Sequence, residues 1–384
     1  MPIDDVLVVG AGPAGSIAGL VLARAGVRVR IVDRASFPRD KLCGDTVNPG
    51  TLARLRALGV ADEVDARGLR VDGMIVTSER DAIVGRYPRG LCGRAILRRD
   101  LDWLLLRQAI AAGCAFDPRV VVTGTDVDDG RVVGVRVAGA RSCRLAARVT
   151  IAADGRRSAI AWSLGAARHP PSPKRWAVGA YFASGTQSIP SPIFGEMHVR
   201  KNCYIGVAPV GPKLTNVCLV KPSHPADASL RDPAGLLHDS LSTDPQLAPR
   251  FASATMIDAP VVMGPLAVDV APPSMDGLLL AGDAAGFIDP MTGDGLRFAV
   301  RGGELAADAA LDALAHGWTG VHARLARRRR DEFGGKQHFN RGLRALVGSP
   351  ALVDAAAIGA RIAPAVLQRV VLRAGDCDIA APLG

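Results

Sequence analysis

Hydrophobic and polar positions follow two different periods near the start of the chain. An apolar run of strand length at residues 6–9 is followed by residues 13–24, where apolar side chains recur at helical spacing. Gly26 ends that helix, and alternation over residues 27–32 predicts a second strand that closes at Asp33. This order predicts a strand–helix–strand unit, the start of a parallel α/β sheet.

The period changes several times further along the chain. The later segments are predicted, in chain order, as a helix at 49–58, paired strands at 69–84, a helix at 98–112, three strands at 115–153, a strand-rich region at 176–263 with one helix near 234–241, a buried strand at 278–281, and helices over 295–372 broken near residues 317, 349 and 364. Residues 115–153 are predicted as a meander rather than another crossover unit, because turn signals separate the three strands.

A βαβ opening followed by a strand-rich centre predicts one domain inserted into another. The fold class is therefore α/β, with a Rossmann-like dinucleotide-binding domain, an inserted antiparallel β-sheet for the substrate, and a C-terminal helical region. The predicted boundaries give residues 1–72, 94–172 and 266–316 to the dinucleotide-binding domain, 73–93 and 173–265 to the substrate domain, and 317–384 to the C-terminal helices.

Composition and charge exclude several classes of protein. A hydrophobic fraction of 48% with 22% charged residues is typical of a globular chain. The net charge is +10, but no basic stripe is interleaved with aromatic residues, so no nucleic-acid partner is expected. Seven scattered cysteines without a Cys-x-x-Cys pair argue against a disulfide framework or a metal site. No secretory segment and no apolar run of roughly 18 residues is found, so a cytoplasmic location is expected.

The C-terminal region allows two interpretations. Four consecutive arginines at residues 327–330 precede a largely apolar stretch over residues 343–372. This order is compatible with a basic surface in peripheral contact with a membrane. It is equally typical of helices that pack on the body of the protein and present a solvated arginine face.

The glycine-rich turn after the first strand is the first candidate for chemistry. Gly10 permits the tight turn, Gly12 lets a pyrophosphate approach the backbone, and Gly15 lets the helix close on the strand. Pro13 and Ala14 open the helix, whose free N–H groups and dipole attract phosphate.

An acidic residue ends the second strand. Asp33 lies 18 residues after Gly15, where a carboxylate accepts hydrogen bonds from ribose hydroxyls, and Arg34 follows it. The turn and this carboxylate together predict a dinucleotide site, without distinguishing FAD from NAD.

Two later motifs place carboxylates after predicted strands. Asp154-Gly155 follows the strand at 149–153, and Gly282-Asp283 follows the strand at 278–280. Ligands bind at the carboxyl ends of strands in open α/β sheets. Either motif alone is also compatible with a helix cap, because aspartate is a favoured N-cap residue.

In this order the three motifs resemble the flavoproteins of the para-hydroxybenzoate hydroxylase fold, over about residues 3–315. That family includes single-component aromatic monooxygenases, flavin halogenases and geranylgeranyl reductases. The resemblance implies an FAD cofactor, with NAD(P)H as a transient reductant because the chain has one dinucleotide fingerprint. It also implies cofactor contacts from Asp283, Asp154 and Arg98, and from Lys41 and Gly44 in the loop after the second strand. A surface position is the alternative for Arg98.

The stretch before the last helical region carries the predicted chemistry. Pro290, Gly293 and Gly295 form a Pro-x-x-Gly-x-Gly turn that opens a helix, and Asp294 and Leu296 lie within it. Backbone N–H groups at such a turn are aimed at the pyrimidine edge of a flavin, where reduced flavin carries negative charge. A glycine-rich helix cap without chemistry is the alternative.

One loop resembles the geranylgeranyl reductase branch. Residues 37–44 read Phe-Pro-Arg-Asp-Lys-Leu-Cys-Gly, and that branch carries Phe-Pro-Arg-x-Lys-x-Cys-Gly with the cysteine near the flavin. Cys43 is therefore a candidate catalytic and cofactor-binding residue. A small buried hydrophobic role fits it equally well.

The reductases also carry an aromatic substrate motif, Tyr-x-Trp-x-Phe-Pro. The comparable residues here are Tyr204, Gly206, Ala208 and Pro209, so two bulky aromatic residues are replaced by small ones. Halogenases carry tryptophans that this stretch lacks. Four apolar neighbours are compatible with the lining of a hydrophobic pocket or with alternating core positions: Ile205, Val207, Leu219 and Val220.

Three hypotheses follow. The leading one is an NAD(P)H-dependent monooxygenase that hydroxylates a hydrophobic or phenolic small molecule with O2 through a flavin C4a-hydroperoxide. The second is a reductase of isoprenoid double bonds, supported by the loop around Cys43. The third is a flavin-binding protein without turnover. Neither the substrate nor the oligomeric state is predicted.

Overall fold

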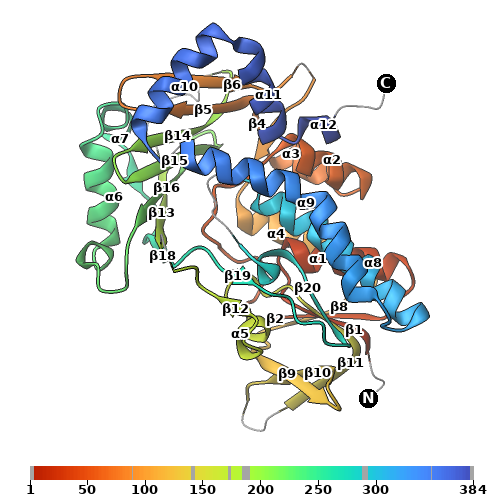
Figure 1. Ribbon diagram of the computed structural model, residues 1–384. Coiled ribbons are helices and arrows are strands. Elements are labelled where there is room, and N and C mark those ends of the chain that lie inside the picture. The colour runs from red at the N-terminus through yellow and green to blue at the C-terminus, as the bar shows by residue number, and fades with distance from the viewer. Residues whose placement is uncertain are drawn as a thin grey trace.

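Two large β-sheets and a run of C-terminal helices organise the computed structural model of the chain (Figure 1). The structure describes residues 4–88, 90–139, 143–171, 174–183, 191–287, 293–346 and 348–380. It confirms the predicted fold class, an α/β chain with a Rossmann-like part, a second sheet and C-terminal helices.

The first sheet is parallel at its centre. Its order is β8, β2, β1, β11, β10, β9, and β20 pairs with β11. The strands are β1 (Asp4–Val9), β2 (Val29–Asp33), β8 (Ala115–Pro118), β9 (Val122–Asp128), β10 (Arg131–Val137), β11 (Cys143–Ala152) and β20 (Leu278–Leu280). β1 lies between β2 and β11 and is parallel to both. The predicted βαβ opening is confirmed, with α1 (Pro13–Arg24) as its helix.

The position of β8 corrects one prediction. Residues 115–153 were expected to form a meander, but β8 pairs in parallel with β2, with Phe116 opposite Ile31. The helix before it, α4 (Arg98–Ala111), packs beside α1 and carries β8 to the β2 edge. Only β9, β10 and β11 form an antiparallel meander. Four residues are too few for their pattern to show which strand they join.

The second sheet is eight-stranded and mostly antiparallel. Its order is β17, β13, β16, β15, β14, β5, β6, and β18 pairs with β13. The strands are β5 (Gly73–Thr77), β6 (Ala82–Arg86), β13 (Arg175–Ala183), β14 (Phe194–Arg200), β15 (Cys203–Gly211), β16 (Leu214–Pro222), β17 (Thr255–Met256) and β18 (Val261–Met263). The helix α6 (Pro233–Ser242) covers one face, where Leu237 and Leu241 join the core.

The C-terminal helices follow the predicted breaks. They are α8 (Gly295–His316), α9 (Val321–Leu346), α10 (Pro350–Ile362), α11 (Pro364–Ala374) and α12 (Cys377–Ala380). In Figure 1, α9 runs diagonally from the first sheet toward the second, and α10 and α11 lie beside β5 and β6. Within the described residues no single helix is long and apolar enough to cross a membrane, and α9 with α10 meets that test only across a bend of 109°.

Short elements connect these parts. They are β3 (Thr46–Val47), α2 (Pro49–Ala57), α3 (Asp62–Arg67), β4 (Leu69–Val71), β7 (Gly93–Ala95), α5 (Ala159–Ser163), β12 (Ala167–Arg168), η1 (Ala228–Leu230), α7 (Ala248–Phe251), β19 (Asp269–Val270) and η2 (Gly282–Ala285).

Candidate active site

The glycine turn closes tightly between β1 and α1. A Cβ atom at Gly15 would lie 1.8 Å from the carbonyl oxygen of Gly10, and Gly10 itself has a φ of 101°. Above Gly12, Nη2 of Arg39 is the one described atom within 4 Å of an added Cβ, at 3.6 Å. The N-terminus of α1 therefore opens toward a space bordered by a cation, which suits a pyrophosphate.

Asp33 holds the turn in place from the end of β2. Its Oδ2 accepts a hydrogen bond from Ala11 N at 2.7 Å, and its Oδ1 accepts one from Ala35 N at 2.8 Å. Because each carboxylate oxygen has two lone pairs, both retain capacity for ribose hydroxyls. The neighbouring Arg34 is exposed.

Three cations gather beside the turn around one buried carboxylate. Arg98 donates from Nε and Nη2 to the two oxygens of Asp102, at 2.8 and 2.9 Å, and Nη2 of Arg39 lies 3.0 Å from the same carboxylate. Burial opposes the charge on Arg98, but Asp102 outweighs it and raises the Arg98 pKa. Burial, followed by repulsion from Arg98, lowers the pKa of Lys41. Arg39 and Asp102 were not predicted as site residues, although the spacing of Arg98 and Asp102 is that of a helical ion pair.

The two strand-end carboxylates have different surroundings. Asp154 accepts a hydrogen bond from Ala159 N at 2.8 Å through Oδ2, while its Oδ1 is buried without a partner among the described residues. Burial raises the Asp154 pKa. The charge of Asp283 raises the pKa of both Lys41 and Arg156, against the lowering by burial. Asp283 therefore lies between the loop after β2 and the Asp154 segment.

Residues 36–45, called here the cofactor loop, dock on the second sheet through Asp45. Oδ2 of this buried carboxylate accepts a hydrogen bond from the Tyr181 hydroxyl at 2.7 Å, and Oδ1 accepts one from Arg98 N at 3.1 Å. Asn216 donates from Nδ2 to Asp45 Oδ2 and to the Cys43 carbonyl oxygen, at 2.5 and 2.6 Å. Burial raises the pKa of Asp45 to about 6. None of Asp45, Tyr181 and Asn216 was predicted, although Asp45 directly follows the Cys-Gly motif.

The face of the second sheet that meets this loop carries three predicted substrate residues. Tyr204, Gly206 and Ala208 share it by strand alternation, and Pro209 falls on the other face. Leu42 of the cofactor loop packs against Gly179 on this face, since its Cδ1 lies 2.3 Å from the position of an added Cβ.

Space remains above Gly206. The nearest described atom to an added Cβ there is the Cys218 carbonyl oxygen, at 3.7 Å. Tyr204, further along the strand, is buried in a cluster with Val353 of α10. The face of the second sheet that meets the cofactor loop is therefore open at Gly206 and covered at Tyr204.

Of the two alternatives for the four apolar neighbours, the structure supports core positions for three. Ile205, Val207 and Leu219 point to the opposite face and pack with the α6 core. Val220 lies on the cofactor-loop side of the sheet, but it is buried together with Tyr204. The alternation that suggested a pocket wall reflects the core under α6.

The start of α8 is held by side chains from distant parts of the chain. The fully buried Asp294 accepts a hydrogen bond from Asn48 Nδ2 at 3.2 Å and one from Asn340 Nδ2 at 2.9 Å. Its Oδ1 lies 3.2 Å from Nζ of Lys336, which is also 3.3 Å from Oδ1 of Asp376. This carboxylate is held by protein partners, and its contact with the cofactor stays a prediction. A buried lysine is strongly destabilised without a carboxylate partner, and Asp294 provides one for Lys336.

The neighbouring residues of that turn are placed differently. Gly293 has a φ of 68°, and no described atom lies within 4 Å of a Cβ added at Gly293 or Gly295. Leu296 is buried in the core, so only its backbone can meet a cofactor. Pro290 lies outside the described residues.

Comparison with known proteins decides the family. Residues 4–321 match the family described as FAD binding domain. The chain belongs to this FAD-binding family. It is 33% identical over 325 residues to a menaquinone reductase of Mycolicibacterium smegmatis, covering 79% of this chain and 75% of that protein. A digeranylgeranylglycerophospholipid reductase of Methanopyrus kandleri is 30% identical over 325 residues, covering 81% of each chain.

Solved structures share the fold of this FAD-binding chain. The flavin-dependent brominase Bmp2 superposes with a TM-score of 0.86 at 22% identity, covering 98% of this chain and 94% of the other. A geranylgeranyl bacteriochlorophyll reductase-like protein of Thermoplasma acidophilum superposes with a TM-score of 0.81 at 21% identity, covering 99% and 95%. The predicted resemblance and the FAD cofactor are confirmed, and the chain is a FAD-dependent oxidoreductase.

The described residues fit FAD. The space over Gly12 bordered by Arg39, the unpartnered Oδ1 of Asp154 and the free acceptor capacity of Asp33 are the groups that a pyrophosphate and sugar hydroxyls need. Arg98 and Lys41 add positive charge beside them. Among the described residues no group of three His, Cys, Asp or Glu side chains forms a metal site.

Proposed function

We propose that the chain is a FAD-dependent reductase that saturates carbon–carbon double bonds in a lipophilic isoprenoid substrate. The observation that carries this proposal is the docking of the cofactor loop, which contains Cys43, on the open face of the second sheet. Relatives at 30–33% identity, named as reductases of menaquinone and of a geranylgeranyl lipid, support it. Both of those named substrates contain isoprenoid chains.

The residues around this face have separate tasks. Leu42 on Gly179 excludes water from one side, and the space over Gly206 accepts an apolar chain. Burial, followed by the charge of Asp45, raises the pKa of Tyr181, so its hydroxyl stays protonated and donates. Bound FAD, reduced by a nicotinamide nucleotide, would supply hydride to one carbon of the double bond, and a proton from solvent would complete saturation at the other.

A monooxygenase acting on a phenolic or other hydrophobic ring is the second candidate. The small residues Gly206 and Ala208, where the reductase motif has aromatic side chains, leave room for a planar ring over the sheet. This candidate additionally requires O2 and NAD(P)H.

We further infer a cytoplasmic enzyme that meets its substrate at a lipid surface through α10 and α11. Three large apolar side chains on these helices, Ile358, Ile362 and Val366, are more than half exposed. Arg361 and Arg369 are exposed beside them. An apolar face flanked by arginines suits peripheral contact with anionic lipid. Sedimentation with phosphatidylglycerol vesicles, compared between the wild type and Ile362→Asp, tests it.

The main experiment separates the two reactions. The FAD-loaded protein is titrated to full reduction with dithionite under argon and mixed with a geranylgeranyl lipid, which has no quinone ring to take up the electrons. A reductase reoxidises its flavin without O2 and yields a product two mass units heavier per saturated bond. Flavin that stays reduced until O2 is admitted, with a product sixteen mass units heavier, would establish the monooxygenase instead.

A variant tests whether the substrate binds on this face of the sheet. Gly206→Trp fills the space on the sheet and is expected to abolish turnover while FAD content stays at the wild-type level. Undiminished turnover in Gly206→Trp contradicts the placement of the substrate on this face.

A further inference from the structure

A second cavity lies between α9 and the chain segments 268–270 and 282–287. Its volume is about 230 Å³. It backs onto the FAD site through Gly282 and Asp283 and through the start of α8. The glycine turn, Asp33, Lys41 and Arg98 do not line it. It is therefore a space behind the cofactor segment rather than the cleft over the glycine turn.

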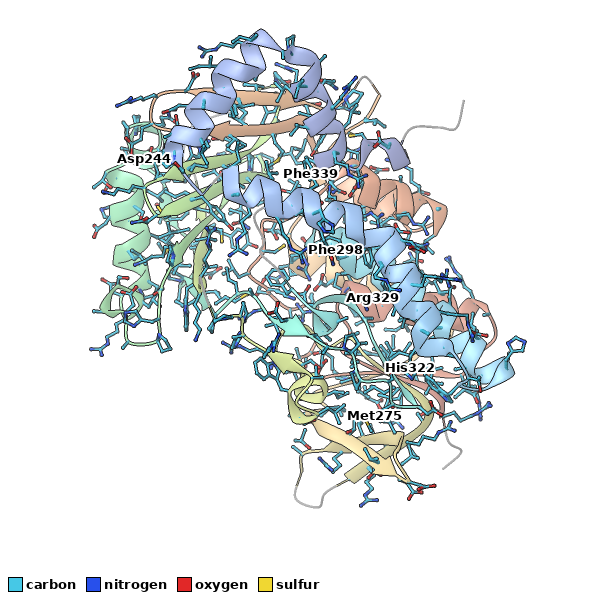
Figure 2. All side chains as sticks on the ribbon, in the orientation of Figure 1. Asp244, Met275, Phe298, His322, Arg329 and Phe339 are labelled. Atoms are coloured by element: carbon cyan, nitrogen blue, oxygen red, sulfur yellow. The ribbon has the colours of Figure 1, made fainter. Side chains whose placement is uncertain are left out.

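One face of α9 supplies the basic wall of this cavity. Arg329, Gln337, Arg341 and Arg344 line it together, because residues eight, twelve and fifteen positions after Arg329 lie on the same side of the helix. Figure 2 labels Arg329 on α9 and Phe298 on the adjacent helix α8. The rings of Phe298 and Phe333, 5.1 Å apart, close the cavity with an apolar surface.

Arg329 is a partly buried cation without a carboxylate partner among the described residues. Its Nη1 donates to the Leu280 carbonyl oxygen at 3.0 Å, and its other N–H groups make no recorded hydrogen bond there. Burial lowers its pKa to about 10. Burying a guanidinium away from water costs free energy unless an anion pairs with it. The position of Arg329 therefore points to an anionic ligand.

The opposite wall carries carboxylates. Asp269 and Asp283 line it, whereas Asp294 is matched by Lys336 at 3.2 Å. Arginines bind phosphate oxygens, and carboxylates accept hydrogen bonds from sugar hydroxyls. Both kinds of partner are present in one ligand class, a phosphorylated ribose.

We propose that this cavity binds a ribose phosphate unit of a nicotinamide dinucleotide, with Arg329 and Arg341 on the phosphate and Asp269 on the ribose. The volume suits one such unit rather than a whole dinucleotide, whose remainder extends along the exposed side of α9. The assignment goes beyond the proposed reductase function, since it holds whichever substrate the reduced flavin meets.

The test measures binding without turnover. The full chain, loaded with FAD and oxidised, is titrated calorimetrically with AMP, NADPH and inorganic phosphate. AMP and NADPH are expected to bind, and Arg329→Gln and Arg341→Gln to raise both Kd values by about tenfold, as for the loss of one charge-assisted hydrogen bond. The matched control is Arg330→Gln, which neutralises an exposed neighbour that does not line the cavity and leaves both Kd values unchanged.

Two results overturn the proposal. Wild-type Kd values for AMP and NADPH in Arg341→Gln would do so, and so would inorganic phosphate binding as tightly as AMP, which means an anion site without recognition of the sugar. Arg341 is exposed, so its variant stays informative even where Arg329→Gln disturbs the contact with Leu280. Dithionite-driven reduction of substrate needs no nucleotide, so failure here is distinguishable from failure of the proposed reductase.

Discussion

The glycine turn and the start of α8 define two ends of one cofactor site by different means. At the turn, backbone closes on backbone, as the 1.8 Å between Gly10 O and an added Cβ at Gly15 shows. At α8, one buried carboxylate, Asp294, is held by Asn48 from α2 and by Lys336 and Asn340 from α9. The first end depends on residues five positions apart, and the second on charges brought together by the whole fold.

The largest effect is expected where backbone meets backbone. Gly15→Val cannot be accommodated beside Gly10 O, so we expect more than about 4 kcal/mol of destabilisation and loss of bound FAD. Urea unfolding and the ratio of flavin to protein absorbance measure both. The control is Gly26→Ala, where φ is +80° but no described atom lies within 4 Å, with an expected cost of about 1 kcal/mol. Similar losses of unfolding free energy in the two variants would contradict a close backbone approach between Gly10 and Gly15.

Breaking the charge network is expected to cost slightly less. Lys336→Met leaves Asp294 and Asp376 buried without their cation, which predicts about 3–5 kcal/mol of destabilisation by urea unfolding. Adding Asp294→Asn to this variant removes the uncompensated charge and is expected to recover part of the loss. A loss below about 1 kcal/mol, or no recovery in the double variant, would mean that the network does not stabilise the start of α8.

The carboxylate of the cofactor loop predicts a dependence on pH. Burial raises the Asp45 pKa from its ordinary 3.8 to about 6, so the folded state binds this proton more tightly than the unfolded state. The stabilisation is complete below pH 3.8 and is lost as the pH rises through 6, by roughly 2–3 kcal/mol in total. The difference in unfolding free energy between wild type and Asp45→Asn should therefore change across this window. Asp40→Asn in the same loop, with an exposed carboxylate, should leave the pH dependence unchanged.

The smallest effect is expected at a glycine in open space. Gly206→Ala places a methyl group where no described atom lies closer than 3.7 Å, so stability should change by less than about 0.5 kcal/mol. Thermal unfolding of Gly206→Ala and Gly15→Val, each compared with the wild type, measures whether the loss of stability is much smaller at Gly206 than at Gly15. A large loss would indicate that the sheet face is already filled.

The parts of the molecule that could be predicted are those determined by short stretches of the sequence. Residues 13–24 form α1 with the predicted bounds, and the helices after α8 break at the predicted positions. The turn, Asp33 and the strand-end carboxylates were found because their spacing alone implies a function.

The rest depends on partners far away in the chain. Asp45 is held by Tyr181 and Asn216, and nothing at residue 45 indicates which sheet will cover it. The choice between core and pocket lining stayed open for Ile205 and Val207 because alternation shows two faces without showing which of them α6 covers. Pairing of β8 with β2 likewise follows from the packing of α4 on α1.

The network around Lys336 also sets an order of events during synthesis. Asp294 leaves the ribosome before the lysine that neutralises it, and Asp376 emerges 40 residues after that lysine. The nascent protein can complete its glycine turn early, because β1, α1 and β2 come first. The helix at the other end of the cofactor has an unmatched charge at its start until Lys336 has been made.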